Sequence, residues 1–378
     1  MDFSYSEEQS LFAESLGKLL AETCDRESRK ALIREDKDHD HALWQSLAEM
    51  GLLGLPLPEE HGGFDGRATD TMVAAIEFGR HLAMEPYAAS VILGGSAIRL
   101  AGNESQKQEL LPKVADGSLK LAAAFLEPGS RFDLACVETT ATASGDNWVI
   151  SGSKNSVLGG GSADKLVVSA RTGGASPRDR DGLSLFLIDT SADSVSKTAY
   201  RMADGVAGAD FVFHNVRVSN ACVLGEPGHA FGILEHISDL GTAALCAEAL
   251  GALEKINEIT LDYLKMRNQF GRPIGDFQVL QHYMSDMLIE YEHAKSLVYE
   301  AAMTADSTNA RERRKAISAA KVFLGEKGRV ICQKAIQMHG GIGMTEEYEL
   351  GDYVKRVMVT ELAFGDTDHH LERYAQNR

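Results

Sequence analysis

The segment Arg267-Asn268-Gln269-Phe270-Gly271-Arg272-Pro273-Ile274 decides the fold of this chain, together with Gln337-Met338-His339-Gly340-Gly341-Ile342-Gly343 further along. An arginine guanidinium is permanently charged and matches a pyrophosphate in planar fashion. Glycines let the backbone approach a ligand closely. Either segment alone is compatible with a surface arginine or a helix C-cap. Which interpretation holds depends on the rest of the chain.

Length, composition and charge limit the number of domains and the kinds of partner that the chain can have. The chain has 378 residues, which predicts two or three packed units rather than one core. Its 55 acidic and 38 basic residues give a net charge of −17, which argues against a nucleic-acid partner. The N-terminus has no signal-peptide pattern and no stretch is long enough to span a bilayer, so we expect a cytoplasmic protein without a membrane partner. The five cysteines lie far apart, as expected of reduced thiols.

The hydrophobic periodicity changes twice along the chain. Residues 1–120 follow a helical period, and residues 121–227 contain short runs rich in β-branched and aromatic residues. The helical period returns over residues 228–378. These changes predict an α+β fold with an N-terminal α-helical domain, a middle β-barrel or β-sandwich domain, and a C-terminal four-helix bundle. The bundle helices are expected at residues 228–265, 277–306, 312–338 and 347–374.

Four segments, in this order and domain context, resemble the acyl-CoA dehydrogenase family. They are Met50–Gly63, Phe125–Ser130 followed by Val149–Lys154, Arg267–Ile274 with Phe277-Gln278, and Gln337–Gly343. The resemblance covers essentially the whole chain and implies an enzyme with FAD as its cofactor. The C-terminal sequence Phe364–Leu371 is most similar to the small subunit of pimeloyl-CoA dehydrogenase and of comparable two-subunit enzymes.

The resemblance also implies a reaction, α,β-desaturation of an acyl-CoA thioester. In the family, a glutamate removes the α-proton while the β-hydrogen leaves as a hydride to flavin N5. Two positions hold that glutamate in different branches. Counted without gaps, they fall on Phe364 and Gly241, neither of which can take up a proton. Asp366 or Glu361 could replace it only after a shift of register, so the usual catalytic base is expected to be missing.

The family's flavin contacts divide into two sets, and this chain keeps only one of them. In the family, the ring is held by the β domain of one subunit. The positions that should supply hydroxyl donors and a stacking indole are here Leu126, Ser156 and Leu158. The adenosine and pyrophosphate end is held by the neighbouring subunit, and those positions are intact: Arg267, Phe270, Gly271, Gln337, Gly340 and Gly341.

Three hypotheses follow from this asymmetry. In the first, the chain is the subunit of a heteromeric FAD-dependent acyl-CoA dehydrogenase that lacks the glutamate and completes the FAD site of a second subunit. In the second, it is a self-sufficient homo-oligomeric dehydrogenase with an unusual base. In the third, it is a flavin-free binding or scaffold protein.

The resemblance further implies electron-transfer flavoprotein as acceptor. Arg131, in a loop that borders the acyl-CoA entrance in the family, is a weak candidate for binding the substrate. His369-His370 lack a partner cluster at ligand spacing, so no metal site is expected.

Overall fold

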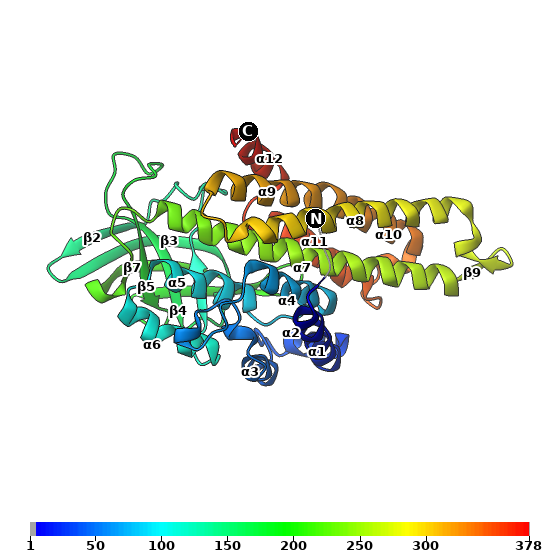
Figure 1. Cartoon of the computed structure of the whole chain (residues 1–378), viewed down its shortest axis with the longest axis horizontal. Coiled ribbons are helices and arrows are strands. Elements are labelled where there is room, and N and C mark those ends of the chain that lie inside the picture. Colours follow the sequence, from blue (N-terminus) through cyan, green and yellow to red (C-terminus); the bar gives the residue numbers. More distant parts are fainter. Residues whose placement is uncertain (1–4, 378) are drawn as a thin grey trace. The chain divides into compact units, whose positions relative to one another are not determined.

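The computed structural model describes residues 5–377, which divide into two compact units. We call residues 32–67 and 84–241 the sheet unit, and residues 5–31, 68–83 and 242–377 the bundle unit. Along the chain, helices are followed by strands and then by helices again, as predicted (Figure 1). The division into three domains at residues 120 and 227 stays a prediction. Within residues 5–377, no helix combines the length and the apolar composition needed to cross a membrane.

The helical part of the sheet unit consists of short elements connected by tight turns. Its helices are α3 (His41–Glu49), η1 (Leu52–Gly54), η2 (Glu59–His61), η3 (Ala88–Gly95, a π-helix), α5 (Ser96–Ala101) and α6 (Glu104–Ala115). Helix α3 ends before Gly51, because this residue adopts a φ of 85° that favours glycine. The indole Nε1 of Trp44 donates a hydrogen bond of 2.9 Å to the carbonyl of Gly117, which ties α3 to the end of α6.

The strands of the sheet unit form one sheet of eight strands. They are β1 (Leu121–Ala124), β2 (Thr140–Ser144), β3 (Asn147–Leu158), β4 (Lys165–Arg171), β5 (Leu183–Asp189), β6 (Val195–Arg201), β7 (Ala207–Ser219) and β8 (Val223–Leu224). Their order is β6-β7-β3-β2-β4-β5-β8, with β1 paired in parallel to β4. Strands β3 and β7 are long and carry register shifts near Gly152 and Val157. Such bulges bend a sheet, so one sheet can enclose its own core.

The core of this sheet is made of apolar side chains that alternate along the strands. Phe186 and Phe211 are fully buried, and Ile150, Leu166 and Val168 pack in the same cluster. On β6, by contrast, the residues from Ser196 to Tyr200 are exposed, as suits an edge strand.

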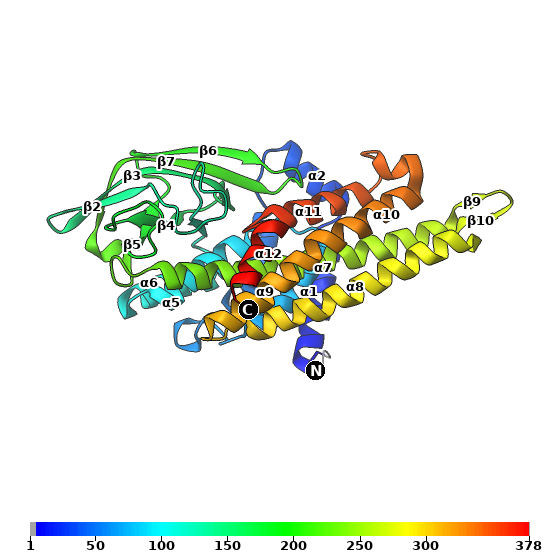
Figure 2. The same cartoon turned by 90° about the horizontal axis from the view of Figure 1, so that it is seen from above.

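The bundle unit contains the long helices of the chain (Figure 2). Its elements are α1 (Glu7–Thr23), α2 (Arg26–Arg34, whose last residues belong to the sheet unit), α4 (Ala68–His81), α7 (Phe231–Met266, of the bundle unit from Thr242 on), β9 (Asn268–Gln269), β10 (Arg272–Pro273), η5 (Ile274–Asp276), α8 (Gln278–Ala305), α9 (Ala310–Phe323), η6 (Leu324–Gly328, a π-helix), α10 (Arg329–His339), η7 (Gly340–Met344), α11 (Leu350–Leu362) and α12 (Thr367–Gln376). Helices α4 and α7 cross with their backbones in contact: a Cβ on Gly79 would lie 1.8 Å from the Glu248 carbonyl oxygen. Only glycine permits this approach.

The prediction of one helix over residues 347–374 is wrong, because the chain breaks between α11 and α12. Phe364 and Gly365 have φ values of 57° and 117°, which end the helical geometry. The buried side chain of Lys321 supports the break. Lys321 Nζ donates to the carbonyls of Thr360 and Glu361, both at 2.6 Å, and so satisfies orphan groups at the end of α11.

Candidate functional site

The two segments that open the sequence analysis lie at the same end of the bundle unit. The ring of Tyr263, in the last turn of α7, stacks on His339 at the end of α10 with 4.4 Å between the ring centroids. The Tyr263 hydroxyl also donates a hydrogen bond of 3.3 Å to the His339 carbonyl. Residues 267–271 follow this tyrosine, and Gly340-Gly341 follow this histidine. We call these two segments and the residues that flank them the free end of the bundle (Figures 1 and 2).

Arg267 introduces the β9–β10 hairpin at the free end. The Ile274 N–H donates to the Arg267 carbonyl at 2.8 Å and closes the hairpin. Phe270 and Gly271 form its tip, with φ values of 54° and 81°. The side chain of Arg267 is exposed, and no carboxylate of residues 5–377 forms an ion pair with it. Its guanidinium is therefore available to an anionic ligand.

Gln337, Gly340 and Gly341 form the second part of the free end, where α10 stops. Gly340 has φ 64° and ψ −141°, a conformation that favours glycine. A Cβ built on Gly340, Gly341 or Gly271 would meet no atom within 4 Å, so the backbone at all three positions faces open space. Exposed backbone groups of this kind suit contacts to phosphate oxygens. The residues present therefore fit the pyrophosphate and adenosine end of FAD.

His339 lies between these residues and has a structural role. Its Nδ1 is 2.8 Å from the Ala335 carbonyl oxygen, its ring stacks on Tyr263 and contacts Tyr348, and it is buried. Burial lowers the pKa of His339, so the ring is neutral at pH 7. A neutral, buried ring supports the turn rather than binding an anion.

The positions predicted for the catalytic base carry no free carboxylate. Phe364 is half-buried at the α11–α12 break, and its carbonyl oxygen lies 3.1 Å from His370 Nε2. Gly241 is buried within α7. Asp366 caps α12 by accepting a 2.9 Å hydrogen bond from the His369 N–H. This bond holds the Asp366 carboxylate in place as a cap.

Glu361, the other possible replacement, is also engaged. Its Oε1 accepts a hydrogen bond of 3.1 Å from the Thr367 hydroxyl and lies 3.6 Å from an Arg329 guanidinium nitrogen. Glu361, Arg329 and Asp366 line one surface cavity of about 520 Å³. The structure thus brings both candidate carboxylates together but gives each of them a local partner.

The three positions expected to face the flavin ring lie in the sheet unit. Leu126 and Leu158 are half-buried, whereas Ser156 is exposed and has a φ of 55°. The two leucines offer no polar side-chain atom, and a serine cannot stack on a ring as an indole does. Arg131, exposed and with a φ of 51°, follows in the loop after β1. Its proposed contact with a substrate stays a prediction.

A buried ion pair connects the two segments that carry these positions. Lys154 Nζ on β3 lies 2.6 Å from Oε1 of Glu127, which follows β1, and also donates to Ser169 Oγ at 2.9 Å. Glu127 in turn accepts hydrogen bonds from the N–H groups of Glu138 and Thr139. The sequence analysis quoted both residues within motifs but did not predict that they pair. The sequence offered no clear signal, because Lys154 lies among the polar residues Ser151, Ser153 and Asn155 of β3.

Burial and the attraction between the two charges have opposite effects on the pKa values of Lys154 and Glu127. Burial lowers the pKa of Lys154 to about 8, against the attraction of Glu127. Burial alone would raise the pKa of Glu127, but the Lys154 charge and the surrounding hydrogen bonds lower it overall. Both groups are charged at pH 7.

Comparison with known proteins identifies the family. Three domain models match in order: the acyl-CoA dehydrogenase N-terminal domain over residues 6–118, the middle domain over 122–220, and the C-terminal domain over 235–377. The chain belongs to the acyl-CoA dehydrogenase family. The expected fold class and the resemblance to this family are confirmed.

Individual relatives agree with this assignment. The chain is 32% identical to the probable acyl-CoA dehydrogenase YngJ of Bacillus subtilis, over 86% of each chain. It is 30% identical to the caffeyl-CoA reductase-Etf complex subunit CarC of Acetobacterium woodii, over 84% of each. The solved structure of the Tcur3481-Tcur3483 steroid ACAD G363A variant matches with a TM-score of 0.87 and 31% identity, over 98% of this chain and 97% of that one. These relatives are dehydrogenases and reductases, so the expected enzyme class, acting on CH–CH bonds, is confirmed.

Proposed function

We propose that this chain is the subunit of a heteromeric FAD-dependent acyl-CoA dehydrogenase that lacks the usual catalytic glutamate and lends its free end to the FAD of a partner subunit. FAD is the cofactor of the family to which the chain belongs. When bound, it supplies the acceptor for the hydride that leaves the substrate. This chain's own residues would bind and orient the phosphate end of that cofactor.

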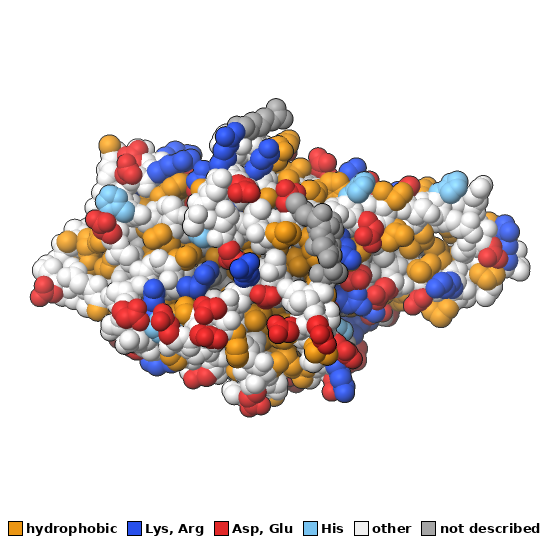
Figure 3. Space-filling view, in the orientation of Figure 1, with side chains coloured by type: hydrophobic (Ala, Val, Ile, Leu, Met, Phe, Trp, Pro, Cys, Tyr) orange, Lys and Arg blue, Asp and Glu red, His pale blue; other side chains and the backbone are white. Residues whose placement is uncertain are grey.

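The observation that carries the proposal is that the arginine and glycines of the free end are exposed and accessible to a ligand. Among residues 5–377 the Arg267 guanidinium has no ion-pair partner, and the three glycines face open space. Large apolar side chains surround them, with Phe270 92% exposed and Met344 75% exposed. On the face shown in Figure 3, hydrophobic side chains are visible along the α7–α8 pair toward the free end. Apolar side chains on this scale are typical of a surface covered by another subunit.

The second argument for the proposal is that the expected positions supply neither a catalytic base nor polar contacts to a flavin ring. A general base must reach the proton that it removes. Phe364 and Gly241 have no ionisable group, and the carboxylates of Asp366 and Glu361 already accept hydrogen bonds. Leu126 and Leu158 cannot donate to a flavin ring. A partner subunit with the usual glutamate and the usual flavin-ring contacts would supply both the base and the ring-binding groups.

The relatives suggest the kind of partners involved. The CarC protein is named as a subunit of a complex with Etf, and the Tcur3481-Tcur3483 dehydrogenase joins two polypeptides in its name. For the present chain we propose a second acyl-CoA dehydrogenase subunit as the structural partner, an acyl-CoA thioester as substrate, and electron-transfer flavoprotein as acceptor.

The Arg267→Ala variant tests the proposal in the assembled enzyme. Loss of a charge-assisted contact to the pyrophosphate should weaken FAD binding by roughly 1.5–3 kcal/mol, about 10- to 150-fold. The measurement is flavin absorbance per protein after dialysis. Arg272→Ala is the matched control, because this arginine lies in the same hairpin but packs over the Phe277 ring at 4.2 Å. Unchanged flavin occupancy in Arg267→Ala, with subunits still assembled, would refute binding in trans.

A further inference from the structure

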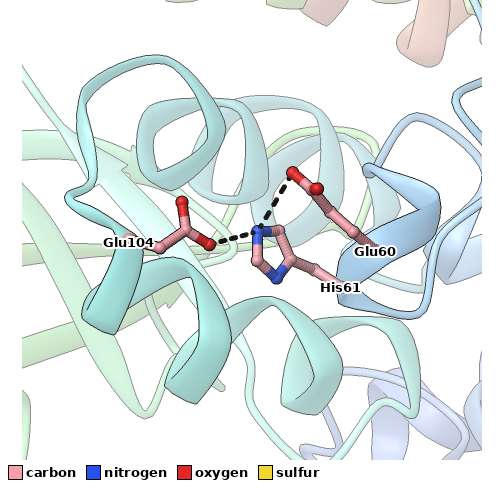
Figure 4. Close-up of side chains that lie close together, drawn as sticks. All are labelled: Glu60, His61 and Glu104. Carbon is pink, nitrogen blue, oxygen red and sulfur yellow. Dashed lines mark ion pairs between the residues drawn. The ribbon is translucent and has the colours of Figure 1, made fainter.

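A histidine and two glutamates of the sheet unit converge away from the residues discussed so far. They are Glu60 and His61 on η2 and Glu104 at the first position of α6 (Figure 4). His61 Nε2 lies 3.2 Å from Glu104 Oε1 and 3.6 Å from Glu60 Oε1. One ligand atom from each residue lies within 4.8 Å of the other two.

The imidazole of His61 is the unusual member of this group. Only 4% of His61 is exposed, and its buried Nε2 has no hydrogen-bond partner among residues 5–377, although both carboxylates face it (Figure 4). A buried polar atom without a hydrogen bond costs about 1–3 kcal/mol. The two glutamate side chains are 76% and 63% exposed, so an ion from solvent can reach the group.

We propose that Glu60, His61 and Glu104 bind a divalent transition-metal cation, with Zn²⁺ as the best match. Ligand atoms about 2.0–2.1 Å from one tetrahedral Zn²⁺ lie about 3.3–3.4 Å from each other. The two separations measured from His61 Nε2, 3.2 and 3.6 Å, fall on either side of this value. An imidazole with two carboxylates suits zinc, whereas Mg²⁺ and Ca²⁺ prefer oxygen ligands alone.

The supporting backbone holds the ligands before any ion arrives. The His61 N–H donates to the Pro58 carbonyl at 3.0 Å and fixes the η2 turn. Glu104 follows Asn103, which forms a capping box with Gln106 at the start of α6. Two carboxylates and a neutral imidazole balance the charge of the ion, and the fourth position is open to water. The ion would join η2 to α6 as a crosslink.

The test uses the full chain, freed of metal by a chelator and titrated with Zn²⁺, and with Co²⁺ as a spectroscopic probe. We expect one ion per chain at this site and visible Co²⁺ absorption typical of a low-coordinate nitrogen and oxygen site. Loss of an outer-sphere partner alone costs about 10- to 100-fold in metal affinity. His61→Gln should therefore cost at least about 100-fold, and Glu104→Gln at least about tenfold.

The His229→Gln variant is the matched control. His229 is an exposed histidine of the same unit with Glu226 at 4.0 Å, and its removal should leave the affinity unchanged. Glu104→Gln alters an exposed side chain and keeps the test valid if His61→Gln fails to fold. Two results would overturn the proposal: no Zn²⁺ binding, which would leave only a histidine–carboxylate contact, or wild-type affinity in both ligand variants, which would show an adventitious ion only.

Discussion

Lys154 and Glu127 show how two individual residues hold neighbouring segments of the sheet unit together. The lysine is fully buried, and it is tolerated because Glu127, Ser169 and the Phe125 carbonyl all accept from its Nζ. A buried ion pair adds little net stability when both partners are present, but removing one partner leaves an uncompensated charge. The ion pair therefore holds β3 against the segment that follows β1, because any arrangement that separates the two residues would leave a buried charge uncompensated.

The Lys154→Met variant should lose about 3–5 kcal/mol of unfolding free energy, because the Glu127 carboxylate would stay buried without its cation. Urea denaturation measures this loss. Lys165→Met is the matched control: Lys165 pairs with Asp189 at the surface of the same sheet, at 2.5 Å, and its loss should cost no more than about 1 kcal/mol. Equal losses in the two variants would contradict a special role for the buried pair.

Glu85 is a second residue whose charge state matters for stability. It is 6% exposed, and its Oε1 accepts a weak hydrogen bond of 3.3 Å from the Asp40 N–H. Burial, with a smaller contribution from the charge of Asp40, raises the pKa of Glu85 from 4.5 to about 7. Between these values the folded chain holds a proton that the unfolded chain has released. Stability contributed by Glu85 is thus present below pH 4.5 and lost as the pH rises through 7.

Glu85→Gln should remove this pH dependence. A difference of 2.5 between the two pKa values corresponds to about 3 kcal/mol. Relative to wild type, the variant should gain about this amount between pH 5 and pH 8, measured by urea denaturation at both values. Glu109→Gln, at an exposed position of the same unit, should show no such gain. A constant difference between Glu85→Gln and wild type across this range would contradict the assignment.

At the scale of elements, the break between α11 and α12 determines the backbone conformation at the position where the family's glutamate is expected. Phe364 stands where the family's glutamate is expected, and the residue after it adopts a φ of 117°. A Cβ on Gly365 would lie 2.5 Å from a carbon of the His369 ring and 2.8 Å from His370 Nε2. The geometry of the break therefore depends on glycine at this position.

Gly365→Ala should destabilise the chain by about 1–3 kcal/mol through backbone strain and the clash with the two histidine rings. Gly351→Ala supplies a control of opposite sign. Gly351 lies inside α11, and a Cβ there would meet no atom within 4 Å. Alanine should stabilise this position by roughly 0.5–1 kcal/mol. Thermal unfolding of both variants measures the difference, and two shifts in the same direction would contradict the explanation.

The elements also show why sequence predicted some parts of the fold and not others. Strands β4 and β5 are nearly continuous apolar runs of the kind on which the predicted β domain rests. Strand β6 gives no such signal, because Ser196–Tyr200 lie exposed at an edge and carry no alternating pattern. The α11–α12 break was missed because the helical period continues through Leu362, whereas the termination depends on Lys321, which is distant in the sequence. The convergence of His61 and Glu104 likewise depends on tertiary structure.

At the scale of the whole molecule, the account assigns different tasks to the two units. The free end of the bundle unit exposes an arginine, open glycines and apolar side chains that suit a partner's cofactor. The sheet unit contains the buried Lys154–Glu127 ion pair, and it has leucines at positions 126 and 158, where the family resemblance implies polar contacts to the flavin ring. The six residues proposed to bind the cofactor were identified from local motifs, and their role stays a prediction. Their exposure at one end of the bundle was not predictable from those motifs.

The most direct test of the central claim is the visible absorption spectrum and native mass of the chain purified alone. The account predicts a chain with little or no flavin, or with flavin that acyl-CoA thioesters do not bleach, and recovery of bleachable flavin once the partner subunit is added. A homo-oligomer that is yellow by itself and loses its flavin absorbance with an acyl-CoA would contradict it, because such a chain would have its own base and its own complete FAD site.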